Sequence, residues 1–181
     1  MTQHLGRKIR DAAFVTPSSP LSLTVCRADY ASPAHAAALV ALLDAYARDP
    51  MGGGQGLSEF AKTSLVPGLA ARPQAYSVLA FKGDQAVGMV NCIEGFSTFA
   101  GRPLVNVHDV AVLASHRGQR IAEKMLALAE VIARGRGACK MTLEVLQGNT
   151  GAIHLYQRLG YAGYQLDPMM GQARFLQKLM V

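Results

Sequence analysis

Residues 107–126 read VHDVAVLASHRGQRIAEKML, and the pattern of these residues changes halfway. The first seven residues are mostly apolar and β-branched, which is typical of a strand, whereas IAEKML begins a segment with helical spacing of apolar residues. Between them, the loop ASHRGQR (114–120) contains Gly118 and, two positions later, Arg120. A strand, a loop and a helix N-terminus can bind phosphate, because the first N–H groups of a helix lack partners within it. The unit is common, so its meaning depends on the sequence around it.

A second strand and helix follow downstream. TLEVLQGN (142–149) predicts a strand that carries Glu144 opposite its apolar residues, and the next helix begins at the N-cap residue Asn149 and contains Tyr156. If the two strands are neighbours, their carboxyl ends meet at the edge where open α/β sheets bind ligands. A carboxylate, a phenol and a phosphate-binding loop would then converge.

The whole chain predicts a mixed α/β fold in the order β-α-α-β-β-β-α-β-α-β-β. Residues 1–20 are expected to be a flexible N-terminal arm, and residues 21–181 a single domain. A glycine-rich loop at 50–56 is expected to be mobile, and Pro67 is expected to stop the second helix. Strands are predicted at 21–28, 76–81, 86–96, 104–113, 139–146, 161–166 and 174–181, and helices at 32–49, 58–65, 121–134 and 149–160.

Composition excludes several classes of protein. The chain has 181 residues, 50% of them apolar and 17% charged, which is too apolar for a disordered protein, and no apolar run is long enough to span a bilayer. The N-terminus is basic but lacks the apolar stretch of a secretory signal, although a short organellar presequence stays an alternative. Three widely spaced cysteines, Cys26, Cys92 and Cys139, are predicted to be reduced core thiols in a cytoplasmic protein.

Two segments at a characteristic mutual spacing resemble the GNAT superfamily of acyl-CoA-dependent N-acetyltransferases. In VAVLASHRGQRIAEKMLALA (110–129), the family's Q/R-x-x-G-x-G/A motif is matched at its ends by Arg117 and Ala122, but Arg120 replaces its middle glycine. In LEVLQGNTGAIHLYQRLGY (143–161), the pattern N-x-x-A-x-x-L-Y-x-x-x-G-[FY] is complete. The close resemblance covers roughly residues 85–165. It implies the GNAT fold, a central twisted mixed sheet of about six to seven strands flanked by helices.

The resemblance also implies acetyl-CoA as co-substrate, with no metal. Backbone groups of Val110, Ala111 and Val112 would pair with the pantetheine arm, which Asn149 would also hold. The N–H of Val112 is a candidate donor to the thioester oxyanion. The pyrophosphate would bind the loop and the first helical turn, at Arg117, Gly118, Gln119, Arg120, Ile121, Ala122 and Glu123.

Acetyl transfer to an amine requires a base and an acid. An alkylammonium group, with a pKa near ~10, must lose a proton before it attacks, and the departing thiolate must gain one. Glu144 is the candidate base, directly or through water, as in the ribosomal-protein N-terminal acetyltransferases of the family, and Tyr156 is the candidate acid. His108 is a rival base, because arylalkylamine acetyltransferases carry histidine there. Structural roles stay open for all three, and Asp109 is expected to face away from His108 and to be structural.

Arg120 leaves two alternatives. We expect it to be αR at the start of the helix, a conformation open to any residue, with its guanidinium folded over the CoA phosphates. The other interpretation is a loop that has lost CoA binding.

The acceptor is expected to be an amine bound by the N-terminal half. Asp44, Tyr46, Asp49 and the loop 49–60 would face it, with Glu94 and Phe96 across from that loop, although these residues could also be solvated surface. We therefore predict a cytoplasmic N-acetyltransferase that acts by direct attack in a ternary complex on a primary amine of a small molecule or a peptide N-terminus.

Two other functions remain as alternatives. The first is a non-catalytic acyl-CoA sensor on the same fold. The second is a nucleic-acid-binding domain, suggested by a net charge of +6, but the long helix carries Glu123 and Glu130 beside its basic residues. No nucleic-acid or membrane partner is expected, and a homodimer is an assembly to be tested.

Overall fold

The computed structural model describes residues 22–164, 167, 169, 171 and 173–180. The predicted N-terminal arm, residues 1–20, lies outside the described residues. The strands are β1 Leu23–Arg27, β2 Ala75–Lys82, β3 Gln85–Ser97, β4 Arg102–Val112 and β5 Met141–Leu143. The helices are α1 Pro33–Arg48, α2 Glu59–Ala70, α3 Ile121–Gly135 and α4 Thr150–Arg158, with short 3₁₀ turns η1 Pro50–Gly52 and η2 Ala114–His116.

The five strands form one mixed sheet in the order β1-β2-β3-β4-β5. The first three pairings are antiparallel, and β5 joins β4 in parallel. A bulge interrupts the β3–β4 ladder, where Asn91 pairs with Asp109 and Cys92 with Val107, so His108 has no partner on β3. A bulge of this kind bends the strand and re-aims its side chains. This one lies at the middle of the predicted site.

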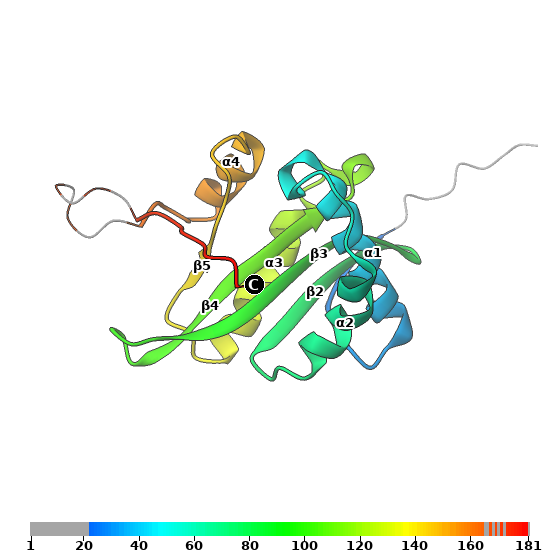
Figure 1. The fold of residues 1–181 in the computed structure, drawn as a ribbon, viewed down its shortest axis with the longest axis horizontal. Helices are drawn as coiled ribbons and strands as arrows, with labels where there is room; N and C mark the ends of the chain where they lie inside the picture. Colours follow the sequence, from blue (N-terminus) through cyan, green and yellow to red (C-terminus); the bar gives the residue numbers. More distant parts are fainter. Residues whose placement is uncertain (1–21, 165–166, 168, 170, 172, 181) are drawn as a thin grey trace, which may run out of the picture.

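The helices cover both faces of the sheet (Figure 1). α3 packs on one face, where Met125 and Ala129 are buried against Val78 and Val90. α1 and α2 cover the other face over β2 and β3, where Leu39, Leu42, Leu79 and Met89 form a second core cluster. Figure 1 also shows α4, the end of α1 and the loop that follows β4 gathered at one end of the sheet. That end is where β4 and β5 have their carboxyl termini.

The fold class is confirmed, whereas the number of strands, the length of the strand expected at 139–146 and the end of the second helix differ from the expectation. The sheet has five strands rather than six to seven, because 161–164 and 174–180, the described parts of the last two expected strands, form no ladder. A segment with alternating apolar residues forms a strand only where a neighbouring strand pairs with its backbone. β5, the edge strand, is only three residues long and offers few such partners. α2 continues through Pro67, which removes only its own N–H from the helix.

The loop after α1 begins with η1, and the side chain of Asp49 caps this turn at Met51 N. The expected mobility of this loop stays a prediction. Within the described ranges, no helix is both long and apolar enough to cross a membrane.

Candidate active site

The central feature of the site is an open edge on β4. β5 pairs with β4 only at Val105, Asn106 and Val107. The pairing ends there, so among the described residues no strand lies beside the edge of β4 from His108 to Val112 that faces away from β3. An exposed edge of this kind can accept an extended ligand as an additional strand. The predicted pantetheine-binding residues Val110, Ala111 and Val112 lie on this edge.

The loop after β4 presents backbone donors. Gly118 has a φ of 75°, and α3 begins at Ile121 without a side-chain cap. Within the part of the chain that the structure describes, the N–H groups from Gly118 to Glu123 donate to no carbonyl or side chain, and the first helical bond runs from Lys124 N to Arg120 O. Unpaired N–H groups at a helix N-terminus favour an anion. The structure therefore places Gly118, Gln119, Arg120, Ile121, Ala122 and Glu123 in one donor-rich turn.

Arg120 differs from its predicted backbone conformation. Its φ is 58° and its ψ is 23°, which is left-handed, and it is the only non-glycine residue with positive φ in the described ranges. The sequence interpretation of αR was wrong because Arg120 is the N-cap of α3 rather than its first helical residue. Its guanidinium, 75% exposed, forms a fork with both carboxylate oxygens of Glu123. The family glycine at this position thus provides a backbone conformation as well as room.

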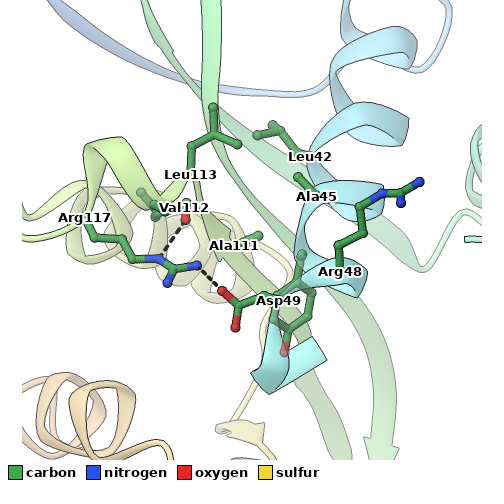
Figure 2. A pocket seen from close by; sticks show the side chains of 10 residues that line it. Leu42, Ala45, Arg48, Asp49, Ala111, Val112, Leu113 and Arg117 are labelled. Atoms are coloured by element: carbon green, nitrogen blue, oxygen red, sulfur yellow. Dashed lines mark hydrogen bonds and ion pairs between the residues drawn. The ribbon is translucent and has the colours of Figure 1, made fainter. Parts of the chain in front are cut away.

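Arg117 connects the two loops that border the end of β4. Its Nε donates to Val112 O at 3.1 Å, and its Nη2 donates to Asp49 Oδ2 at 2.8 Å. Figure 2 shows this guanidinium between the carbonyl and the carboxylate, beside a cavity of about 330 Å³. The bond from Arg117 holds the pKa of Asp49 below its usual value. The side chain of Arg117 therefore faces the loop after α1 rather than the donor-rich turn.

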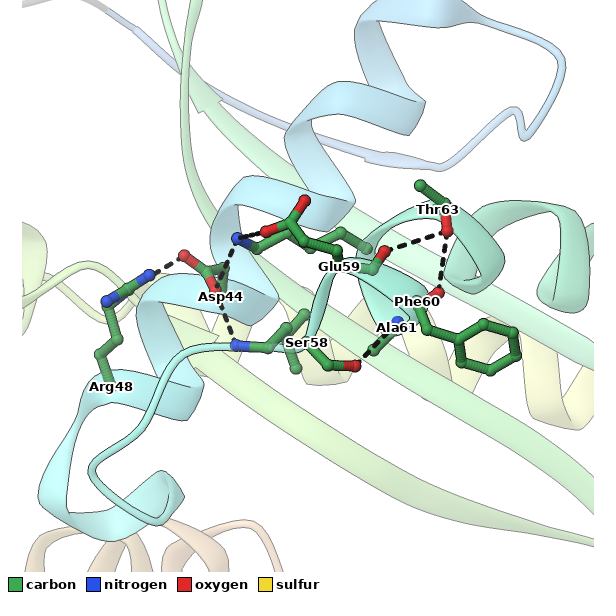
Figure 3. A network of polar contacts seen from close by, with 9 residues as sticks. Asp44, Arg48, Ser58, Glu59, Phe60, Ala61 and Thr63 are labelled. Atoms are coloured by element: carbon green, nitrogen blue, oxygen red, sulfur yellow. Dashed lines mark hydrogen bonds and ion pairs between the residues drawn. The ribbon is translucent and has the colours of Figure 1, made fainter.

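The predicted acceptor carboxylates already have partners. Asp44 accepts from Arg48 Nε at 3.0 Å and from Leu57 N at 2.8 Å, and Lys62 lies at 3.9 Å (Figure 3). The hydrogen bond from Arg48 is the largest cause of the lowered pKa of Asp44. Asp44 and Asp49 thus fasten the two ends of the loop between α1 and α2. Their charges are compensated within the protein.

Tyr156 and Tyr46 come from different helices to the same region. Tyr156 is 9% exposed and packs edge to face on Tyr161, with ring centroids 5.8 Å apart. Burial raises the pKa of Tyr156 to about 12, and the Tyr46 phenol adds to this shift. Within the described residues, the Tyr156 hydroxyl makes no hydrogen bond. Tyr156 is therefore a protonated phenol at neutral pH, with its donor available.

The two candidate bases are joined by the amide of Asn106, whose contacts to both were not predicted from the sequence. Asn106 Nδ2 donates to Oε1 and Oε2 of Glu144, both at 3.2 Å, and Asn106 Oδ1 lies 3.4 Å from His108 Nδ1.

Glu144 lies just beyond β5 and, together with Tyr156, borders a wide hollow of about 1810 Å³ between β5 and α4. Asn149 caps α4 at Ala152 N, as predicted. The alternation of β4 could have indicated Asn106, which shares its open face with the candidate bases.

Two other expectations need correction. Glu94 does not face the acceptor loop, because its carboxylate lies 3.3 Å from Arg136 at the end of α3. Phe96 is 61% exposed, in agreement with the alternative of solvated surface. Cys139 is exposed rather than in the core, since β5 starts only at Met141. The described residues contain no group of three or more His, Cys, Asp or Glu placed to hold a metal ion.

Comparison with known protein families identifies one that matches this sequence. The model of the acetyltransferase (GNAT) family matches residues 36–161, which is more than half of the chain. The chain belongs to this family. The resemblance noted in the sequence is thereby confirmed, and it extends from α1 to the end of α4.

Individual GNAT relatives match over shorter stretches. The chain is 36% identical over 90 residues to the streptothricin acetyltransferase of Streptomyces lavendulae, which covers 48% of each chain. It is 29% identical over 93 residues to N-alpha-acetyltransferase 30 of Schizosaccharomyces pombe, or 50% of this chain and 59% of that protein. The chain spans only about half the length of these curated relatives.

Solved structures show the same fold over most of the chain. A probable acetyltransferase has a TM-score of 0.72 at 20% identity, covering 87% of this chain and 99% of the other. An aminoglycoside acetyltransferase from an uncultured soil metagenomic sample has a TM-score of 0.70 at 16% identity, covering 87% and 97%. At these identities the likeness concerns the fold alone.

Proposed function

We propose that this GNAT protein is an enzyme that transfers an acetyl group from acetyl-CoA to the primary amine of a small molecule or a peptide N-terminus. The observation that carries the proposal is the open edge of β4, which leads directly into a turn of unpaired N–H groups. An extended arm that ends in a pyrophosphate, as in acetyl-CoA, fits both features. Acetyltransferases among the relatives support the type of reaction.

The proposal assigns a role in acetyl transfer to each candidate residue. The pantetheine arm would lie along Val110, Ala111 and Val112, and the Val112 N–H would donate to the developing oxyanion. The amine nitrogen attacks the thioester carbonyl, the C–S bond breaks, and the thiolate takes the proton of Tyr156. The proton of the ammonium group goes to Glu144 or His108, directly or through water.

Two measurements test the proposal in sequence. Acetyl-CoA should raise the melting temperature, because a ligand that binds only the folded state stabilises it, by about 2.7 kcal/mol at 100 times Kd. Dephospho-CoA should bind less tightly if a basic side chain contacts the 3′-phosphate. Release of CoA is then followed with spermidine, kanamycin and a peptide with N-terminal alanine as acceptors. Stabilisation by acetyl-CoA without turnover of any amine would favour a non-catalytic sensor, and no stabilisation at millimolar acetyl-CoA would refute both.

The base is identified by substitutions that replace each candidate with a neutral amide that does not titrate. Glu144→Gln and His108→Gln each remove one proton acceptor, and the loss of the true base should abolish the acidic limb of the kcat/KM profile against pH. His154→Gln, at an exposed position on α4, is the matched control for the histidine. Survival of both limbs in both variants would assign the proton to ordered water and contradict both assignments.

A further inference from the structure

One polar row crosses the sheet on the face that α1 covers. Ser77 on β2 pairs in register with Asn91 on β3, and Asn91 pairs with Asp109 on β4. Ser77 is 0% exposed and Asn91 is 3% exposed. The neighbouring row on the same face is apolar and consists of Leu79, Met89 and Ala111. Three polar side chains inside an apolar face must satisfy one another, because an unpaired buried polar group is costly.

The hydrogen bonds of this row all run in one direction. Asn91 Nδ2 donates to Asp109 Oδ2 at 3.0 Å, so Asn91 Oδ1 faces Ser77 Oγ, which donates to it at 2.6 Å. Ser77 has only one proton, so the Tyr30 hydroxyl, 2.9 Å from Ser77 Oγ, must be the donor of that pair. Burial raises the pKa of Tyr30, which keeps this phenol a donor. Each of these three hydrogen bonds is therefore donated in the direction of Asp109.

Asp109 differs in its charge balance from the carboxylates of the acceptor loop. Asp44 and Asp49 each form an ion pair. Asp109 forms none among the residues that the structure describes, and its bond from Asn91 comes from a neutral amide. A half-buried carboxylate without a counter-charge costs free energy of folding. Costly features of this kind are expected at functional sites.

Asp109 also lies in the right place for the reaction. On the same face of β4, Ala111 lines the cavity at the end of the strand together with Val112 and Tyr46. Burial raises the pKa of Tyr46, and the charges of Asp109 and Asp49 add to this shift. Asp109 is three residues before Val112 on β4. Asp109 therefore lies one row along the sheet from the residue that lines this cavity, on the face that α1 covers.

We propose that Asp109 binds the ammonium group of the acceptor, and that Tyr30, Ser77 and Asn91 are positioning residues that aim its carboxylate. This inference rests on the acetyl transfer proposed above and names the acceptor class, an amine that arrives as a cation. It differs from the sequence expectation, in which Asp109 is a structural residue. The bulge at His108 matters here, because the register of Cys92 with Val107 would otherwise place Asp109 opposite Val90 instead of Asn91.

The principal test is Asp109→Asn, which removes the charge but leaves an oxygen that can accept from Asn91. We expect KM for the amine that wild type acetylates fastest, among spermidine, kanamycin and the alanine peptide, to rise about 10- to 100-fold, as for loss of a hydrogen bond to a charged group. The dependence of this KM on salt should flatten, and the thermal shift with acetyl-CoA should not change. Glu130→Gln on α3, which removes a carboxylate from the opposite face, is the control and should leave KM unchanged.

The positioning residues are tested by a double-mutant cycle. Tyr30→Phe deletes the first donor at the half-buried end of the chain, and we expect a threefold to tenfold rise in amine KM, on the order of one neutral hydrogen bond. In the Asp109→Asn background the same change should have no further effect on KM, because there is no charge left to aim. A role of Tyr30 in stability alone would lower the melting temperature equally in both backgrounds and leave KM unchanged.

The outcomes separate this inference from the proposed function. Wild type that binds acetyl-CoA but acetylates no amine refutes the function and the inference together. Wild type that acetylates an amine with the same KM as Asp109→Asn keeps the function and overturns the inference. Binding of that amine to the protein with CoA present, followed by calorimetry, gives a second readout that does not require turnover, and it should weaken by the same factor in Asp109→Asn.

Discussion

Arg120 shows how a single residue can combine a backbone constraint with a charge. It adopts a left-handed conformation that costs a non-glycine residue roughly 1–2 kcal/mol, and its guanidinium is held by Glu123. A CoA phosphate would have to share this guanidinium with Glu123 or replace Glu123. The contribution of the charge to CoA binding is therefore separable from that of the backbone.

Two substitutions at position 120 make this separation. Arg120→Gly removes both the charge and the strain, whereas Arg120→Ala removes the charge and keeps the strain. We expect Arg120→Gly to have the higher melting temperature of the two, because only glycine adopts this conformation freely. If the guanidinium contacts phosphate, both variants should lose about tenfold to a hundredfold in CoA affinity, with a flatter salt dependence. Equal affinity in all three proteins would show that the backbone alone forms the turn.

Tyr156 is the residue for which position and protonation agree best. Its pKa of about 12 keeps the proton on the phenol across the physiological range. Tyr156→Phe keeps the packed ring and removes the donor, so we expect kcat to fall by about 10²-fold with little change in KM for acetyl-CoA. Steady-state CoA release measures both constants, and an unchanged kcat would assign Tyr156 to the core alone.

At the scale of elements, the close approach of β3 and α3 depends on one glycine. A Cβ at Gly88 would lie 2.8 Å from Met125 Cε and 3.0 Å from the carbonyl oxygen of Ala111. Met125 is fully buried and Ala111 O belongs to the adjacent strand, so neither can move freely.

We expect Gly88→Ala to destabilise the fold by about 1–3 kcal/mol through overpacking. Gly95→Ala on the same strand is the matched control, because its Cβ would meet only Leu104 at 3.7 Å, and it should change stability by less than about 0.5 kcal/mol. Urea unfolding of the two variants makes the comparison. A similar cost for both would mean that the loss arises from the strand backbone rather than from contact with α3.

For the whole molecule, buried phenols determine stability at high pH. Burial raises the pKa values of Tyr156 and Tyr161 to about 12, compared with about 10 in an unfolded chain. The folded state then holds more protons than the unfolded state between these values. Stability from these groups is complete below about pH 10 and is lost as the pH rises toward 12.

We therefore expect the urea midpoint of wild type to fall between pH 10 and 12, and the fall to be smaller in Tyr156→Phe, which has one fewer buried phenol to ionise. Tyr164→Phe, at a position 59% exposed, is the control and should follow wild type. Unfolding is measured by circular dichroism at each pH. Parallel curves for wild type and Tyr156→Phe would show that Tyr156 does not ionise with unfolding.

Much of the fold and part of the site could be predicted from local sequence. The strand, loop and helix of 107–126 and the cap at Asn149 depend on residues close together in the chain, so their signals are local. The same holds for the hairpin of β2 and β3 and for Tyr156 on α4. These elements were sufficient to indicate the family, which the match over residues 36–161 confirmed.

The tertiary structure alone decided which of these residues act together. The bulge at His108 depends on pairing between β3 and β4, and it brings Asp109 into line with Asn91 and Ser77. The ion pair between Arg117 and Asp49 joins residues 68 positions apart. Sequence patterns report the period of an element, which is local, whereas register, bulges and long-range partners depend on which edge an element meets. The chain by itself therefore indicated most of its elements and its family, and packing determined which carboxylates form ion pairs.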